Sequence, residues 1–176
     1  AGSPTKLAYL IDLIDQTELN ALVVDIKDYS GFAAYETGLP AVKNSGAEKE
    51  IRITRPNTFI KDLHDRGIYL IGRISVFQDQ VLAKARPEWA VRNKVTGETW
   101  TDKNNLAWLD PSISGVWDYN LAIASDALRR GFDEINFDYI RFPTDGPKEK
   151  YFPIWNNLDP QPSKTEVVEI FLAKLT

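Results

Sequence analysis

The run GFDEINFDYIRFP, residues 131–143, carries the strongest indication of the fold. Gly131 is typical of the residue that ends a helix, and residues 134–140 read as a strand that follows it at once. Pro143 cannot continue a strand ladder and directs the chain into a loop. The run predicts a helix-to-strand unit of a parallel sheet, with the carboxyl group of Asp138 near the end of the strand.

The remainder of the chain repeats this alternation of helix and strand. Apolar runs and helical spacing with caps predict strands at 20–27, 68–77 and 134–140, and helices at 4–18, 55–66, 110–130 and 164–175. Residues 29–54 are expected to form a long loop, residues 78–88 a short irregular helix, and the Gly97 region a hairpin turn. We expect one α/β domain over residues 1–176, either a small open sheet or an incomplete barrel.

Composition excludes several classes of function. The net charge of −4 offers no electrostatic surface for nucleic acid. The chain has no cysteine and one histidine, His64, which excludes thiolate and multi-histidine metal centres. Apolar runs are too short for a membrane span. We therefore expect neither a metal nor a cofactor.

Strand alternation gathers polar side chains at one end of the predicted sheet. The residues that should share a face are Val23, Asp25 and Lys27, then Ile71, Arg73 and Ser75, then Asn136, Asp138 and Ile140. Each strand thus carries polar groups towards its carboxyl end, where active sites of barrels and open α/β sheets lie. The simpler alternative is a structural ion-pair network, for example Asp25 with Lys27 or Arg73 with Asp138.

The run at 131–143, with TELNALVVDIKD at 17–28 and GRISVF at 72–77, resembles a known family. That family is the glycoside-hydrolase-like barrel domain of bacterial envelope proteins, first catalogued as a domain of unknown function. The resemblance covers essentially the whole chain. It implies a partial (β/α)₈ TIM barrel of the α-amylase-like group, in which this N-terminal half supplies strands two to four. It also implies an extracytoplasmic location.

The resemblance further assigns roles to residues. In similar barrels the aspartate at the end of the fourth strand is the nucleophile, which maps onto Asp138, while the general acid comes from a later strand beyond Thr176. We expect Asp138 to be the catalytic nucleophile or stabiliser of a hydrolase acting on a polysaccharide or envelope glycan. The expected substrate-binding residues are Asp25, Lys27, Arg73, Asn136, Tyr139, Arg141 and Trp108.

Aromatic residues near the predicted strand ends could stack on sugars. Trp100 and Trp108 flank the loop at 101–105, and Tyr139 follows Asp138 directly. Aromatic faces suit the C–H faces of sugar rings, although packing in the core is the simpler role for each tryptophan.

Two other functions remain open at the level of sequence. One is a non-catalytic barrel that binds glycan or peptidoglycan. The other is a magnesium-dependent phosphoryl-transfer or lyase barrel, which would need a third oxygen ligand beside Asp25 and Asp138. A half barrel leaves sheet edges and an inner face unpaired, so we also expect the rest of the barrel, or a second copy, to cover them.

Overall fold

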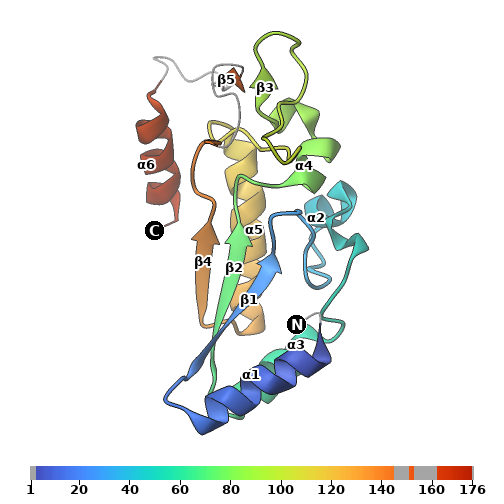
Figure 1. Cartoon of the computed structure of the whole chain (residues 1–176), viewed down its shortest axis with the longest axis vertical. Helices are drawn as coiled ribbons and strands as arrows, with labels where there is room; N and C mark the ends of the chain where they lie inside the picture. The colour runs from blue at the N-terminus through green and yellow to red at the C-terminus, as the bar shows by residue number, and fades with distance from the viewer. Residues whose placement is uncertain (1–2, 145–150, 153–161, 176) are drawn as a thin grey trace.

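A three-stranded parallel sheet forms the centre of the computed structural model, which describes residues 3–144, 151–152 and 162–175. The strands are β1 (Ala21–Lys27), β2 (Tyr69–Ser75) and β4 (Glu134–Asp138), in the order β1-β2-β4. Helix α5 (Ser114–Arg130) lies behind the sheet, and α1 (Pro4–Gln16) and α3 (Pro56–His64) cross its lower end (Figure 1). This arrangement confirms the predicted parallel α/β fold.

Local capping sets the ends of the helices. The Ser3 hydroxyl accepts a hydrogen bond from the backbone N–H of Lys6 at the start of α1. Ser163 and Glu166 form a capping box at the start of α6 (Lys164–Lys174). Gly131 ends α5 with a φ of 113°, in the left-handed region that favours glycine. The three signals lie where the sequence predicted helix ends.

The prediction that α5 begins at Asp110 is wrong, because Asp110 forms a turn instead. Its carboxylate accepts hydrogen bonds from the backbone N–H and the hydroxyl of Ser112, and α5 begins only at Ser114. An aspartate that bonds its own chain two residues onward favours a turn over a helical start.

The segment predicted as a long loop, residues 29–54, contains ordered elements. Helix α2 (Pro40–Ser45) and the 3₁₀ turn η1 (Ala47–Lys49) lie in it. Val42 and Ala47 are buried in the core. The segment therefore packs as part of the domain.

The region after β2 is built from short elements. Helix α4 (Gln80–Ala85) and the 3₁₀ turn η2 (Pro87–Trp89) precede β3 (Arg92–Asn93), which pairs antiparallel with β5 (Tyr151–Phe152). The predicted hairpin turn is confirmed, since the backbone N–H of Asn93 bonds the carbonyl of Glu98 at 2.8 Å and Gly97 has a φ of 73°.

Alternation along the strands separates a buried face from an exposed one. Val24, Ile26, Leu70 and Ile74 are buried in the core. The opposite face leaves Val23 56% and Tyr69 43% exposed. A sheet covered by helices on one face has the layering expected of a barrel wall.

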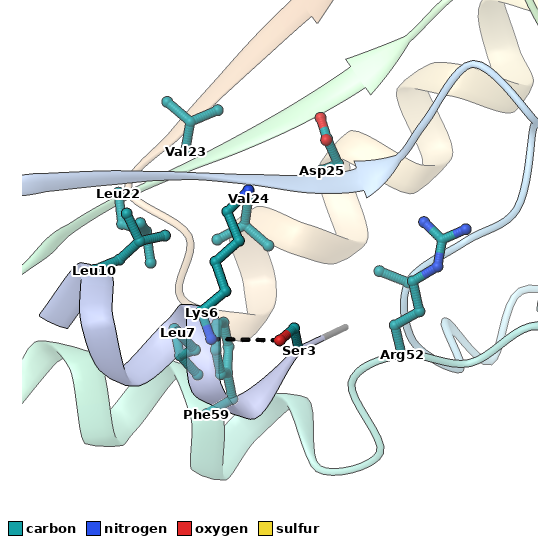
Figure 2. Close-up of a pocket in the computed structure, with 11 residues that line it drawn as sticks. Ser3, Lys6, Leu7, Leu10, Leu22, Val23, Val24, Asp25, Arg52 and Phe59 are labelled. Carbon is teal, nitrogen blue, oxygen red and sulfur yellow. Dashed lines mark hydrogen bonds between the residues drawn. The ribbon is translucent and has the colours of Figure 1, made fainter. Parts of the chain in front are cut away.

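The outer edge of β1 borders a hollow of about 310 Å³. Figure 2 shows Leu22 and Val24 pointing towards α1, while Val23 and Asp25 point to the other side of the strand. In the described sheet β1 pairs with β2 alone. That the rest of a barrel or a second copy covers this sheet remains a prediction.

Within the described residues, no helix has both the length and the apolar character needed to cross a bilayer.

Lys27 departs from the face that alternation predicted. The register between β1 and β2 shifts between Asp25 and Lys27, so that Lys27 pairs with Ile74. Such an irregularity re-aims the side chains that follow it. The Lys27 ammonium is fully buried and lies 2.7 Å from the carboxylate of Asp79, which is also fully buried. Lys27 is therefore an internal anchor, and the expectation that it shares a face with Asp25 is wrong.

Asp79 joins the end of β1 to the start of α4. Its second oxygen accepts the backbone N–H of Leu82 at 2.7 Å and so caps α4. A Cβ added to Gly31 would lie 2.0 Å from the same oxygen, so the chain passes close to the carboxylate. These contacts fix the loop after β1 against the loop after β2.

Replacing Asp79 with asparagine tests this anchor. Asp79→Asn keeps a cap for α4 but leaves the buried ammonium of Lys27 without a counter-charge. We expect the free energy of unfolding, measured by urea denaturation, to fall by about 3–5 kcal/mol.

Asp118→Asn is the matched control, because Asp118 pairs with Lys174 at the surface. Its effect should stay below about 1 kcal/mol. Equal effects of the two substitutions would contradict the anchoring role of Asp79.

Candidate functional site

The candidate site lies at the rim, by which we mean the carboxyl ends of β1, β2 and β4 and the residues directly after them. The parallel register places Arg73 opposite both Asp25 and Asn136, and Ser75 opposite Asp138. Because parallel strands end at the same edge, polar groups from three strands gather there. The expectation that these strand ends carry neighbouring polar groups is met by Asp25, Arg73 and Asp138.

Arg73 bonds two carboxylates from the strands on either side of it. Its Nη1 donates to Asp25 Oδ1 at 2.7 Å. Its Nε and Nη2 donate to Asp138 Oδ2 at 2.9 and 2.5 Å. The planar guanidinium carries several donors in a fixed fork, which suits it to joining two acids. Of the two ion pairs that the sequence suggested, Arg73 with Asp138 is present, whereas Lys27 pairs with Asp79.

The environment of Asp138 lowers the pKa of its carboxyl group. Partial burial acts in the opposite direction and would raise the pKa. Hydrogen bonds from the Arg73 side chain and from the backbone N–H of Tyr139, with the positive charges of Arg73 and Arg141, outweigh it. Asp138 is consequently a carboxylate near neutral pH.

Tyr139 has an uncommon backbone conformation directly after Asp138. Its φ is 54°, in the left-handed region that residues other than glycine seldom adopt. Its N–H bonds Asp138 Oδ1 at 2.6 Å. Strained backbone of this kind persists where the surroundings fix it, and it often lies at functional sites. Here it accompanies a sharp exit of the chain from β4.

Trp108 does not offer a sugar-binding face. It is fully buried, and Trp100 is 2% exposed. The indole of Trp108 donates to Asp102 at 3.1 Å, and its ring meets that of Tyr139 edge to face at 5.9 Å between centroids. The expectation that Trp108 binds substrate is therefore wrong, and the simpler role in core packing is the one observed. The ring of Trp108 packs against that of Tyr139.

A hollow of about 470 Å³ opens at the rim. It is lined by Tyr29, Gln78, Asp102, Asn104, Leu106, Tyr139 and Arg141. Tyr139 and Arg141 were expected to bind substrate, whereas Gln78 and Asn104 were not among the expected residues. Gln78 could have been found from its place shortly after β2, whereas Asn104 comes from a distant loop.

Asn136 and Ser75, two further polar residues of the strands, differ in exposure. Asn136 is exposed on the same side of the sheet as Arg73, one strand away. Ser75, by contrast, is buried, and its hydroxyl bonds the carbonyl of Gln78 at 2.8 Å. Of the two polar residues of β2, Arg73 is therefore the one that contributes to the surface of this face.

The arrangement of Asp25 and Asp138 is unlike that of a pair of metal ligands. The guanidinium of Arg73 bonds both carboxylates and holds a positive charge between them. Among the described residues, no group of three acidic, histidine or cysteine side chains has the geometry to hold a metal ion. The contacts of Arg73 count against the magnesium hypothesis.

A parallel sheet with acids at its carboxyl edge is an architecture shared by barrels and open α/β sheets, and comparison with known proteins distinguishes the two. A crystal structure of a hypothetical protein from Ruminiclostridium thermocellum is 40% identical, with a TM-score of 0.85 over 98% of this chain and 85% of that one. The α-galactosidase from Lactobacillus brevis is 13% identical, with a TM-score of 0.61. The α-galactosidase of Thermus thermophilus in complex with stachyose is 15% identical, also at 0.61.

The chain spans only part of these enzymes. It covers 22% of the Lactobacillus galactosidase and 33% of the Thermus galactosidase, with 97% and 96% of its own residues. These two likenesses therefore show the fold, a portion of a glycoside-hydrolase TIM barrel. Among curated proteins, no significant match to the chain was found.

The family is shown by a match over the whole chain. The family described as "Putative glycosyl hydrolase domain" matches residues 1–176, and the chain belongs to it. The resemblance of residues 17–28, 72–77 and 131–143 to a glycoside-hydrolase-like barrel family is confirmed, as is the partial TIM-barrel fold.

Arg73→Gln tests the electrostatics of the rim. The folded-state pKa of Asp138 lies below its ordinary value of 3.8, so the ionised carboxylate adds stability above that pH. This contribution is lost as the pH falls through the folded-state pKa. Wild type should exceed Arg73→Gln in free energy of unfolding at pH 7, and the gap should narrow below pH 3.8, as urea denaturation at several pH values would show.

Arg66→Gln serves as the control, since Arg66 meets the half-exposed Asp15 at 3.4 Å at the other end of the sheet. The difference in free energy of unfolding between wild type and Arg66→Gln should be smaller and should depend less on pH. If the difference in free energy of unfolding between wild type and Arg73→Gln widened on acidification, Arg73 would not be stabilising the ionised carboxylate of Asp138.

Proposed function

We propose that this domain hydrolyses glycosidic bonds in a polysaccharide, with Asp138 as nucleophile or as stabiliser of the transition state. The main support for the proposal is the ionised carboxylate of Asp138 at the end of β4, which accepts two hydrogen bonds from Arg73. A glycosidase nucleophile must be deprotonated to attack the anomeric carbon, and a stabiliser must be negative to face an oxocarbenium-like transition state. Membership of the glycosyl hydrolase family supports this reaction class.

Arg73 is a positioning residue in this proposal. Two of its N–H groups bond Asp138 Oδ2 and fix the orientation of the carboxylate before substrate arrives. The other oxygen, Oδ1, is held by the backbone N–H of Tyr139. Preorganised groups of this kind avoid reorganisation during the reaction.

Asp25 orients Arg73 from the opposite side. Its Oδ1 accepts a charge-assisted hydrogen bond from Arg73, and its side chain is 47% exposed. An acid catalyst must instead give a proton to the leaving oxygen. We therefore assign Asp25 to the support of the site and expect the general acid to come from another part of the barrel.

The remaining rim residues would bind sugar hydroxyls. Asn136 is exposed beside Arg73, and Tyr139 and Arg141 line the hollow at the rim. Amide, phenol and guanidinium groups form directional hydrogen bonds with hydroxyls, while the tyrosine ring offers an apolar face. Lys27 is left out of this set because it is fully buried against Asp79.

Asp138→Asn in the intact protein tests the assignment. The substitution preserves shape but removes the negative charge, so we expect kcat on a responsive glycan to fall by at least about a thousandfold. The measurement is release of reducing ends from a panel of polysaccharides.

Asp118→Asn is the control for loss of a surface acid, because Asp118 lies on α5 and pairs with Lys174. It should leave hydrolysis unchanged. Hydrolysis by Asp138→Asn at the wild-type rate would contradict the assignment of Asp138. If wild type bound glycan without turnover, the domain would be a binding domain.

A further inference from the structure

Gln78 places a buried amide in the lining of the hollow at the rim. The residue follows shortly after β2 and is only 6% exposed. Within the described residues, its side-chain amide has no hydrogen-bond partner. A buried amide is costly without such bonds, so one that the protein does not engage points to a ligand or to water. The lining of the hollow therefore holds a polar group that can meet a ligand.

The backbone around Gln78 is fixed on both sides. The Ser75 hydroxyl donates to the carbonyl of Gln78 at 2.8 Å, and Gln78 pairs with Trp108 in an antiparallel bridge. The next residue, Asp79, is held by the buried ammonium of Lys27 at 2.7 Å. These contacts hold the main chain and not the amide, so the side chain extends from a rigid base. Groups that are already in place cost little to order when a ligand binds.

The hollow adjoins the proposed catalytic carboxylate. The backbone N–H of Val76, two residues before Gln78, donates to the carbonyl of Asp138 at 2.9 Å. Tyr139, which follows Asp138 directly, lines the same hollow. A sugar unit held there would therefore lie next to the unit that is cleaved.

The two charged residues of the lining have opposite signs. The Asp102 carboxylate accepts the backbone N–H of Leu106 at 3.0 Å and the indole N–H of Trp108 at 3.1 Å. The Arg141 guanidinium donates to the hydroxyl of Thr144 and lies 5.0 Å from the ring centroid of Trp108. Because the lining holds one acid and one base, neither sign is in excess, and the hollow suits a ligand without net charge.

Neutral groups make up the rest of the polar lining. Asn104 carries a second amide, and Tyr29 is 53% exposed and offers the face of its ring. Amides donate to and accept from hydroxyls, and aromatic faces pack on the C–H faces of sugar rings. These groups and Gln78 come from three separate segments of the chain, after β1, after β2 and in the loop at 101–105. A few polar groups that converge on a hollow from separate segments are typical of a binding site.

We propose that the hollow at the rim is a subsite for an uncharged sugar unit, with Gln78 as the residue that binds a sugar hydroxyl and Tyr29 as the ring on which the sugar packs. The inference rests on the proposed glycoside hydrolase function, because it names the substrate class of the same site as a neutral polysaccharide. A ligand without the hydroxyl would leave the buried amide unpaired, so the amide also provides selectivity.

The test is calorimetric titration of the intact protein with cello-, xylo-, manno-, galacto- and chito-oligosaccharides, and with a uronic acid oligosaccharide as the charged comparison. Asp138→Asn is used for binding so that turnover does not interfere. We expect at least one uncharged oligosaccharide to bind. Gln78→Met in this background should weaken that binding about ten- to a hundredfold, because the hydroxyl then meets an apolar side chain.

Urea denaturation separates binding from a role in the fold. Gln78→Met removes no hydrogen bond in the part of the chain that the structure describes, so its midpoint should not fall below that of wild type. Asn120→Leu provides the contrast, because Asn120 is a fully buried amide that donates to the carbonyl of Val116 at 2.8 Å. Its midpoint should fall.

Two further substitutions locate the sugar. Tyr29→Phe should keep most of the affinity because the ring remains, whereas Tyr29→Ala should lose it. Gln16→Met is the matched control for Gln78→Met, since Gln16 is an exposed residue of α1 that bonds Asp12 at 2.8 Å. Affinity should be unchanged in Gln16→Met.

Affinity, folding and turnover distinguish the proposals. If no uncharged oligosaccharide bound, or only the uronic acid did, the subsite would be overturned. Unchanged affinity in Gln78→Met would overturn the role of Gln78, as would a lowered urea midpoint, which would show that the amide supports the fold. Retained hydrolysis by Asp138→Asn would count against the catalytic assignment alone, because the subsite is measured by binding.

Discussion

The parallel register of β1, β2 and β4 is the constraint on which the site depends. It brings three strand ends to one edge and sets Arg73 between a carboxylate from each neighbouring strand. Two like charges gathered at one edge would repel, and the guanidinium between them offsets that repulsion. The same contacts orient Asp138 and hold it ionised, so the fold and the proposed chemistry share one interaction.

Most of the fold could be predicted from the sequence because local rules governed it. Caps such as Ser3 and Ser163 and the glycine at 131 marked helix ends that the structure confirms. Strand alternation also predicted that Arg73 and Asp138 would be neighbours, because period-two geometry and parallel pairing leave few other arrangements.

The rest could not be predicted, because it depends on contacts between distant segments. The register shift after Asp25 turned Lys27 into the core, where Asp79, 52 residues further along the chain, supplies its counter-charge. Trp108 is buried because Asp102 and Tyr139 enclose it, and no spacing in the sequence distinguishes such a ring from a sugar platform. Strand alternation suggested Asp138 as a partner of Arg73, but that Arg73 bonds Asp25 as well is seen only in the folded protein.

The ionisation of Asp138 connects all of these features, and it can be measured by itself. A carbon-13 NMR titration of the wild-type aspartate carboxyl groups reports the pKa of Asp138 directly. We expect a value below 3.8, because Arg73 and the N–H of Tyr139 outweigh partial burial. A value at or above 3.8 would show that burial prevails, and it would contradict the view of the rim as a preorganised anionic site.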